Sequence, residues 1–292
     1  FERRLKSDGK VAAAKPRLQA DPSGGGAARA DLVTEPAAAQ RSGRHAVFAA
    51  LETVIKPDAI LATNTSAIPL EDIATALQDP SRLIGLHFFN PVPVLPLVEV
   101  IWSRHSDQNL VSRGMQFAGQ ISKMPIRCQS APGFLVNRAL LPYMFKAVEA
   151  VAAGENADQI DEALVDFGMP MGPIELCDQV GLDVCLDVGM VLGIAPAAEK
   201  ILRAHCAAQN RGRKTGSGFY QWDGNRPIRP RAAVDAAVMA EIAASMLAPM
   251  IEQCQQAVDA GVVDSADSAD AGMIFGTGFP GFRGGPLHWS KQ

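Results

Sequence analysis

The chain has few cysteines, and they form no motif. Its five cysteines are odd in number and scattered without a C-x-x-C pair, at Cys128, Cys177, Cys185, Cys206 and Cys254. Neither a disulfide framework nor a zinc site is suggested, and we expect a reducing, cytoplasmic location. We interpret the cysteines, like the methionines, as core residues.

Surplus positive charge and long apolar runs are also missing. The chain has 27 Lys and Arg against 31 Asp and Glu, with a net charge of −4 and a pI near 5.8. Because no excess of cations can replace the counterions of a phosphate backbone, nucleic acid is excluded as a partner and a small-molecule substrate is favoured. No apolar run is long enough to cross a bilayer, which predicts no integral membrane segment.

What the chain does have is apolar content for a sizeable core, 48% over 292 residues. Residues 45–128 alternate short apolar strands with amphipathic helices, which predicts a parallel, doubly wound (Rossmann-type) sheet of which only the second half is present. Strands are expected at 59–63, 83–86, 97–101 and 125–128, and helices at 46–55, 68–77 and 108–121. Residues 1–44, rich in Ala, Gly, Arg and Pro, are expected to be irregular or aberrant apart from a strand at 30–34.

After Pro132 strand patterns stop and a helical region is predicted, with helices at 135–153, 157–167, 181–192 and 234–260. It contains an internal repeat: the series 140–144, Gly154, Asp158, Asp161, 167–168 and 172–173 recurs as 246–250, Gly261, Asp264, Asp267, 275–276 and 285–286. We therefore expect three parts. These are a partial Rossmann-type domain at 1–128, a helical domain at 129–224, and a second, truncated copy of the helical domain at 225–292.

Polar residues follow two of the predicted strands, where ligands bind in open α/β sheets. Asn64 and Ser66 follow the strand at 59–63, and His87 follows the next strand. Glu99 lies inside the strand after that one. Three prolines between His87 and Glu99 exclude a helix there, so a return of the chain that places the two side chains together is expected.

A His–Glu pair points to general-base chemistry. A carboxylate bonded to one imidazole nitrogen fixes the tautomer and raises the basicity of the other nitrogen. His87 could then remove a hydroxyl proton while hydride leaves a secondary alcohol, a contribution of about 10² to 10⁴ in rate. Ser66 and Asn137 could hold the substrate oxygen.

The same residues also have a structural interpretation. A lone His at the end of a strand is usually a packing residue, and Asn64 or Ser66 could cap the following helix. Asn137, near the start of a predicted helix, could do likewise. Glu99 is harder to explain in this way, because a carboxylate between two valines is costly to bury without a partner.

The only literal glycine-rich nucleotide motif is a false match. Residues Gly276-Thr-Gly-Phe-Pro-Gly281 fit G-x-G-x-x-G, but they follow a helical pattern and contain a proline. No βαβ unit surrounds them, so we reject them as a nucleotide loop.

Five motifs in register resemble the 3-hydroxyacyl-CoA dehydrogenases, and their order and spacing fit over about residues 46–222. The second helical copy, ending at 276–287, is similar to the multifunctional α-subunit of the fatty-acid oxidation complex. The motifs are Thr63-Asn-Thr-Ser66, His87-Phe-Phe-Asn-Pro91 with Leu97-Val-Glu-Val-Ile101, Ala131-Pro-Gly-Phe-Leu-Val-Asn137-Arg138, Met171-Gly-Pro-Ile-Glu-Leu176 and Gly212-Arg-Lys-Thr-Gly-Ser-Gly-Phe-Tyr220.

This resemblance implies oxidation of an L-3-hydroxyacyl-CoA to the 3-ketoacyl-CoA with reduction of NAD, within fatty-acid β-oxidation. His87 would be the catalytic base and Glu99 its partner, while Ser66 and Asn137 would bind the acyl-CoA substrate. It further implies a homo-oligomer and a thiolase β-subunit as partner. The cofactor contacts it implies are Asn64, Ser66, Asn90 and Arg44.

The chain departs from the family pattern in its first part. The family's glycine-rich turn and ribose-binding acidic residue would precede Phe1, so we expect an N-terminally truncated chain that lacks backbone donors for the pyrophosphate. An acidic cofactor contact falls on Ala39, and Arg44 stands where a Lys is usual. This stretch has the length that the family pattern requires but a composition unlike it, as in a segment translated in a shifted reading frame.

Two other functions stay open on the sequence alone. One is a catalytically inactive remnant with a structural or assembly role, which NAD binding would separate from an enzyme. The other is a dehydrogenase of free hydroxy acids, which the second helical copy argues against. A panel of CoA esters and free acids would decide that question.

Overall fold

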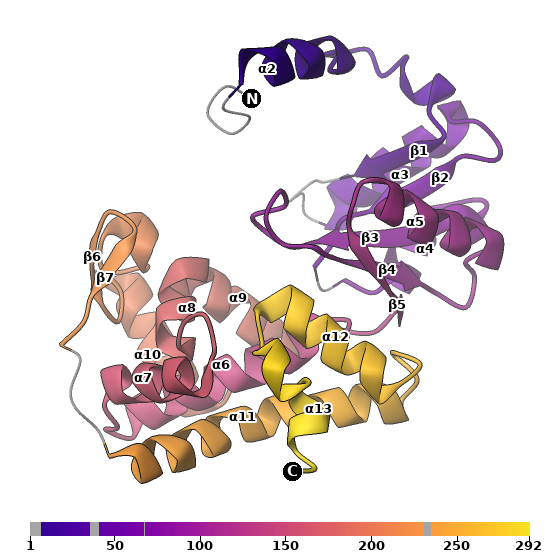
Figure 1. Ribbon diagram of the computed structural model, residues 1–292. Coiled ribbons are helices and arrows are strands. Elements are labelled where there is room, and N and C mark those ends of the chain that lie inside the picture. The colour runs from indigo at the N-terminus through magenta and orange to yellow at the C-terminus, as the bar shows by residue number, and fades with distance from the viewer. Residues whose placement is uncertain (1–6, 36–40, 67, 231–234) are drawn as a thin grey trace.

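The computed structural model describes residues 7–35, 41–66, 68–230 and 235–292 (Figure 1). A sheet region comes first along the chain and a helical region follows, as the sequence predicts. In the described residues, none of the helices combines the length and apolar character that crossing a membrane requires.

The sheet has five strands in the order β1-β2-β3-β4-β5. The pairs β1·β2, β2·β3 and β4·β5 are parallel, which confirms the predicted α/β architecture, while β3 and β4 are antiparallel. The reversal arises because residues 89–96 are too few for the crossover that parallel neighbours need, about a dozen residues. The strands are β1 (Leu32–Glu35), β2 (Ile60–Thr63), β3 (Leu83–Phe88), β4 (Leu97–Trp102) and β5 (Met124–Gln129).

Helices α3 (Arg41–Val54), α4 (Leu70–Ala74) and α5 (Gln108–Gln120) connect these strands. Asp107 starts α5 by accepting a hydrogen bond from the Asn109 N–H at 2.7 Å. Helix α5 covers one face of the sheet, where Gly114 allows the close approach: a Cβ there would lie 2.6 Å from a methyl of Ile84. The predicted helix at 68–77 is shorter than expected.

Residues 7–31 add little to the core, as expected. Val11 is the only buried apolar side chain among them. This stretch nevertheless contains a helix that the sequence pattern did not indicate, α2 (Asp8–Ala14), in which alanine has high helix propensity. Two 3₁₀ turns follow, η1 (Lys15–Arg17) and η2 (Ala27–Arg29).

The helical region is built on two long helices that pack against each other, α6 (Val136–Ala152) and α11 (Ala236–Asp259) (Figure 1). A hairpin of β6 (Gln221–Asp223) and β7 (Arg226–Ile228) lies in the connector, so the expectation of no strands after Pro132 is wrong here; three-residue strands are too short to show periodicity. The other elements are α7 (Ala157–Phe167), α8 (Pro173–Val180), α9 (Leu182–Leu192), α10 (Pro196–Ala207), α12 (Ala266–Thr277), α13 (Pro286–Trp289) and the 3₁₀ turns η4 (Arg213–Thr215) and η5 (Gly281–Arg283).

The structure shows a repeated device in the two halves of the helical region. Asp161 of α7 accepts hydrogen bonds from the first backbone N–H groups of α8, and Asp270 of α12 does the same for α13. Both α7 and α12 end at a left-handed glycine, Gly168 and Gly278. The equivalent of Asp161 is therefore Asp270, and the pairing of Asp161 with Asp267 from the sequence pattern is wrong by three residues.

The rejected glycine motif has a packing role. Gly276 lies in α12, which rests on β4 and β5. A Cβ at this position would lie 2.7 Å from a methyl of Leu97 and 3.0 Å from one of Val136. The motif thus ends a helix that contacts the sheet, and no strand leads into it.

Candidate active site

His87 and Glu99 form a buried pair. The antiparallel register of β3 and β4 places them directly opposite each other, and His87 Nδ1 lies 2.6 Å from Glu99 Oε2. Glu99 is fully buried and His87 is 5% exposed. The contact expected from the sequence is therefore present, and it results from the short return between the two strands.

The other oxygen of Glu99 is bound by the start of α6. Glu99 Oε1 accepts hydrogen bonds from the backbone N–H groups of Leu135 at 3.0 Å and Val136 at 2.9 Å. The Cys128 thiol lies 4.0 Å from the same oxygen, and burial together with the charge of Glu99 raises the pKa of this thiol well above its ordinary value. These two donors fix the position of the Glu99 carboxylate at the start of α6. None of these partners was indicated by the sequence pattern.

The His87 ring is held by two phenylalanines. The ring centroids of Phe89 and Phe134 lie 4.5 and 5.7 Å from that of the imidazole. Phe134 has a φ of 52°, a left-handed conformation that is uncommon for a bulky residue and is often found at functional sites. Among the described residues none hydrogen-bonds to His87 Nε2, which leaves that nitrogen for a substrate.

Ser66 and Asn137 are brought together across 71 residues of chain. Asn137 Nδ2 donates a hydrogen bond to the Ser66 carbonyl oxygen at 2.8 Å, which joins the end of β2 to the first turn of α6. Ser66 is exposed. Neither residue caps a helix. The N-cap residue of α6 is Leu135 and that of α4 is Pro69, and neither N-cap makes a side-chain capping hydrogen bond. The capping interpretation is therefore wrong.

Asn64 and Asn90 lie near the ends of β2 and β3. The Asn64 side-chain oxygen accepts a hydrogen bond from the Phe88 N–H at 3.0 Å, so Asn64 links the ends of the two strands. Asn90 is exposed and precedes a cis peptide bond to Pro91. Within the described part of the chain, no hydrogen bond to the Asn90 side chain is seen.

Arg44 is buried beside a carboxylate. Its Nε lies 3.6 Å from Glu35 Oε2 at the end of β1, and Thr63 Oγ1 donates to the same oxygen at 3.3 Å. Glu35 was not among the residues singled out from sequence, although its place at the end of a predicted strand was a signal that could have found it. Ala39 lies outside the described residues.

The residues present suit one end of a dinucleotide. An amide at Asn64, a hydroxyl at Ser66 and an amide at Asn90 lie at the carboxyl ends of β2 and β3, and the Asn64 N–H₂ group has no acceptor among the described residues. These groups fit a nicotinamide and its ribose. The described turns from β2 to α4 and from β4 to α5 contain no glycine, so neither resembles a pyrophosphate loop.

Comparison with known families agrees with this geometry. The model of the 3-hydroxyacyl-CoA dehydrogenase NAD-binding domain matches residues 1–131, and that of the C-terminal domain matches residues 133–222. The chain belongs to the 3-hydroxyacyl-CoA dehydrogenase family. Proteins of this family are NAD-dependent oxidoreductases, and the sheet followed by helices is their fold.

Solved and curated members show how far the likeness extends. The structure of (S)-3-hydroxybutyryl-CoA dehydrogenase from Ralstonia eutropha is 31% identical, with a TM-score of 0.69 over 74% of this chain and 79% of that one. The 3-hydroxybutyryl-CoA dehydrogenase from Escherichia coli K12 is 25% identical, with a TM-score of 0.80 over 97% and 81%. The fatty acid oxidation complex subunit alpha of Ectopseudomonas oleovorans is 35% identical over 96% of this chain. The chain spans about two fifths of that relative, 42%.

Proposed function

We propose that this chain carries out the dehydrogenase step of its family, oxidation of an L-3-hydroxyacyl-CoA to the 3-ketoacyl-CoA with NAD. The observation that carries the proposal is the buried His87–Glu99 pair, with Nδ1 and Oε2 2.6 Å apart. The family membership given above supports the choice of substrate and cofactor.

In this mechanism His87 Nε2 accepts the proton of the substrate 3-hydroxyl group. Glu99 accepts the Nδ1–H of the same ring, which keeps the proton off Nε2 before the reaction and stabilises the imidazolium afterwards. NAD would accept the hydride that leaves the carbon bearing this 3-hydroxyl group. The two phenylalanines that flank the imidazole exclude water from one side of the base.

Ser66 and Asn137 would position the substrate oxygen beside His87. Within the described residues, the Ser66 hydroxyl and the Asn137 side-chain oxygen make no other hydrogen bond and could contact the substrate. Asn64, Ser66, Asn90 and Arg44 would contact the nicotinamide side of NAD. Arg44 would do so from its buried position beside Glu35.

For the whole protein we propose a role in fatty-acid β-oxidation in the cytoplasm, as a homo-oligomer that pairs with a thiolase β-subunit. The support is that curated relatives are named as the alpha subunit of a fatty acid oxidation complex. All five cysteines are free thiols, which suits a reducing compartment. We also propose the division into parts at 1–128, 129–224 and 225–292, the last repeating the helical unit.

The test is NADH formation by this chain with NAD and 3-hydroxybutyryl-CoA. His87→Ala is expected to lower the rate by about 10² to 10⁴, because general-base assistance is lost. His105→Ala is the matched control, since His105 is an exposed histidine of the same region. Equal rates for the two variants would overturn the assignment of the base, and no turnover together with no NAD binding by the unaltered chain would favour an inactive remnant.

A further inference from the structure

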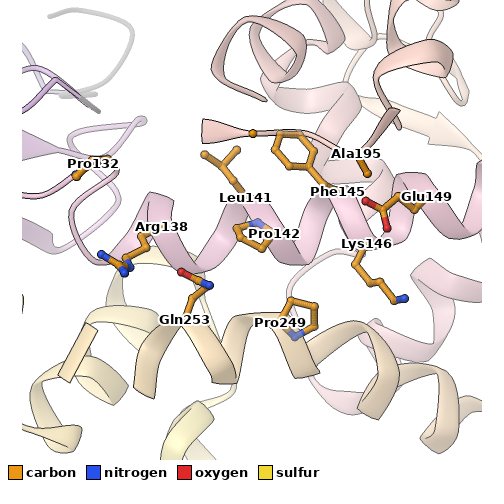
Figure 2. A pocket seen from close by; sticks show the side chains of 11 residues that line it. Pro132, Arg138, Leu141, Pro142, Phe145, Lys146, Glu149, Ala195, Pro249 and Gln253 are labelled. Carbon is orange, nitrogen blue, oxygen red and sulfur yellow. The ribbon is translucent and has the colours of Figure 1, made fainter. Parts of the chain in front are cut away.

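A groove in the described part of the helical region is lined by α6, by α11 and by Gly193 and Ala195 before α10 (Figure 2). Its volume of about 700 Å³ is in the range of small-molecule sites, roughly 300 to 1,000 Å³. His87, Glu99, Ser66 and Asn137 do not line it, so it is separate from the catalytic pair. The groove has no place in the function proposed above.

Each of the two long helices contains a proline that lines the groove. These are Pro142 of α6 and Pro249 of α11, which the repeat alignment places one position apart (Figure 2). A proline removes a helical hydrogen bond and presents an apolar ring at the helix surface. Leu141 and Phe145 complete an apolar surface along α6.

The charged residues of the groove are unevenly placed along α6. Arg138 and Lys146 are eight residues apart, about 12 Å along a helix. Glu149 lies one turn beyond Lys146, so the three side chains together leave one positive charge uncompensated. None of the three has an ion pair within the described residues, and Arg138 Nε is buried without an acceptor. The groove therefore has a net charge of +1 and, at one end, a guanidinium nitrogen without an acceptor.

We propose that the groove binds a long-chain carboxylate, with its head on Arg138 and its aliphatic chain along Leu141, Pro142, Phe145 and Pro249. A guanidinium matches the planar carboxylate through two parallel hydrogen bonds. A single uncompensated cation favours a monoanion over a phosphate dianion. The stripe from Arg138 to Glu149 is about 16 Å long, which suits an extended alkyl chain.

Calorimetric titration of the chain with octanoate, decanoate and dodecanoate tests the proposal, each below its micelle-forming concentration. Affinity is expected to rise by up to about fourfold for each added methylene, the value for burial of apolar surface. Dodecanol, which has the same chain and no charge, is expected to bind at least about tenfold more weakly than dodecanoate. Equal binding of the two, or no binding of any carboxylate, would overturn the proposal.

Two pairs of variants locate the site. Arg138→Gln is expected to weaken the affinity for dodecanoate about 10- to 100-fold. Arg203→Gln removes the same charge from an exposed side chain of α10 and is expected to leave the affinity unchanged. Ala195→Phe fills the groove and abolishes binding, whereas Ala197→Phe, on the exposed side of α10, does not. Unchanged binding by Ala195→Phe would place the ligand elsewhere and refute the groove.

The groove-filling pair keeps the test decisive if Arg138→Gln does not fold, because Ala195 is partly exposed and outside the core. Thermal melting of each variant shows that it is folded. The readout is the heat of binding, so the result is independent of whether the chain turns over a hydroxyacyl-CoA.

Discussion

Glu99 in the sheet and Asp161 in the helical region are buried in the same way, but one hydrogen-bond donor to each carboxylate differs. Each carboxylate is fully buried and accepts two backbone hydrogen bonds from the start of a helix, Glu99 from α6 and Asp161 from α8. The further donor to Glu99 is the imidazole of His87. The further donor to Asp161 is the hydroxyl of Tyr220, at 2.8 Å.

The partner decides what the carboxylate can do. An imidazole can act as a general base, and His87 Nε2 has no hydrogen-bond partner in the described structure. By contrast, burial and the charge of Asp161 raise the pKa of Tyr220 far above its ordinary value, so this hydroxyl keeps its proton. The same capping device therefore supports general-base chemistry in the sheet and holds two helices together in the helical region. Three isosteric amide variants test this difference.

The largest effect is expected for Glu99→Gln, on activity. The amide oxygen would accept from the Leu135 and Val136 N–H groups, which turns the amide N–H₂ toward His87 Nδ1. The imidazole must then carry its proton on Nε2, the tautomer that cannot act as a base. We expect NADH formation to fall by about 10² to 10⁴ while the variant stays folded in a thermal melt. Activity within tenfold of the unaltered chain would show that Glu99 only supports packing.

Asp161→Asn should instead change the pH dependence of stability. Burial is the main cause that raises the pKa of Asp161 from 3.8 to about 7, while hydrogen bonds from Ile174, Tyr220 and Glu175 oppose the rise. A carboxyl whose folded pKa lies above its unfolded one stabilises the protein at low pH, and this contribution is lost as the pH rises through about 7.

Between pH 5 and pH 8 the unaltered chain should lose about 3 kcal/mol of unfolding free energy relative to Asp161→Asn. Chemical denaturation of both proteins at the two pH values measures this difference. The comparison between the two carboxylates would fail if the difference were independent of pH.

Asp270→Asn is expected to act in the same direction and to a smaller extent. Burial raises the pKa of Asp270, and hydrogen bonds from the Leu287 and His288 N–H groups lower it. Because Asp270 is 6% exposed whereas Asp161 is fully buried, its carboxyl keeps more contact with water. The same denaturation series should show a shallower change with pH. A steeper change than for Asp161 would contradict the assignment of Asp270 as the weaker copy of this device.

Much of the architecture was predictable because it depends on local patterns. Runs of four or five residues located all five sheet strands to within two residues, including the strand expected at 30–34 and found at Leu32–Glu35. The prolines between His87 and Glu99 predicted the return that pairs them. The alignment of the helical repeat failed at Asp270, because sequence similarity gives no information on which carboxylate reaches the start of the next helix.

By itself the sequence determined the order of the five sheet strands, the family and the His87–Glu99 candidate, since periodicity, proline positions and motif spacing are properties of neighbouring residues. Only the tertiary structure decided what holds Glu99 on its second oxygen, and that a groove opens between Pro142 and Pro249. The physical reason is that nearly every residue offers a backbone N–H, so a helix start becomes a carboxylate partner only through its position in space. The packing that forms the groove likewise leaves no mark in the sequence pattern of either helix.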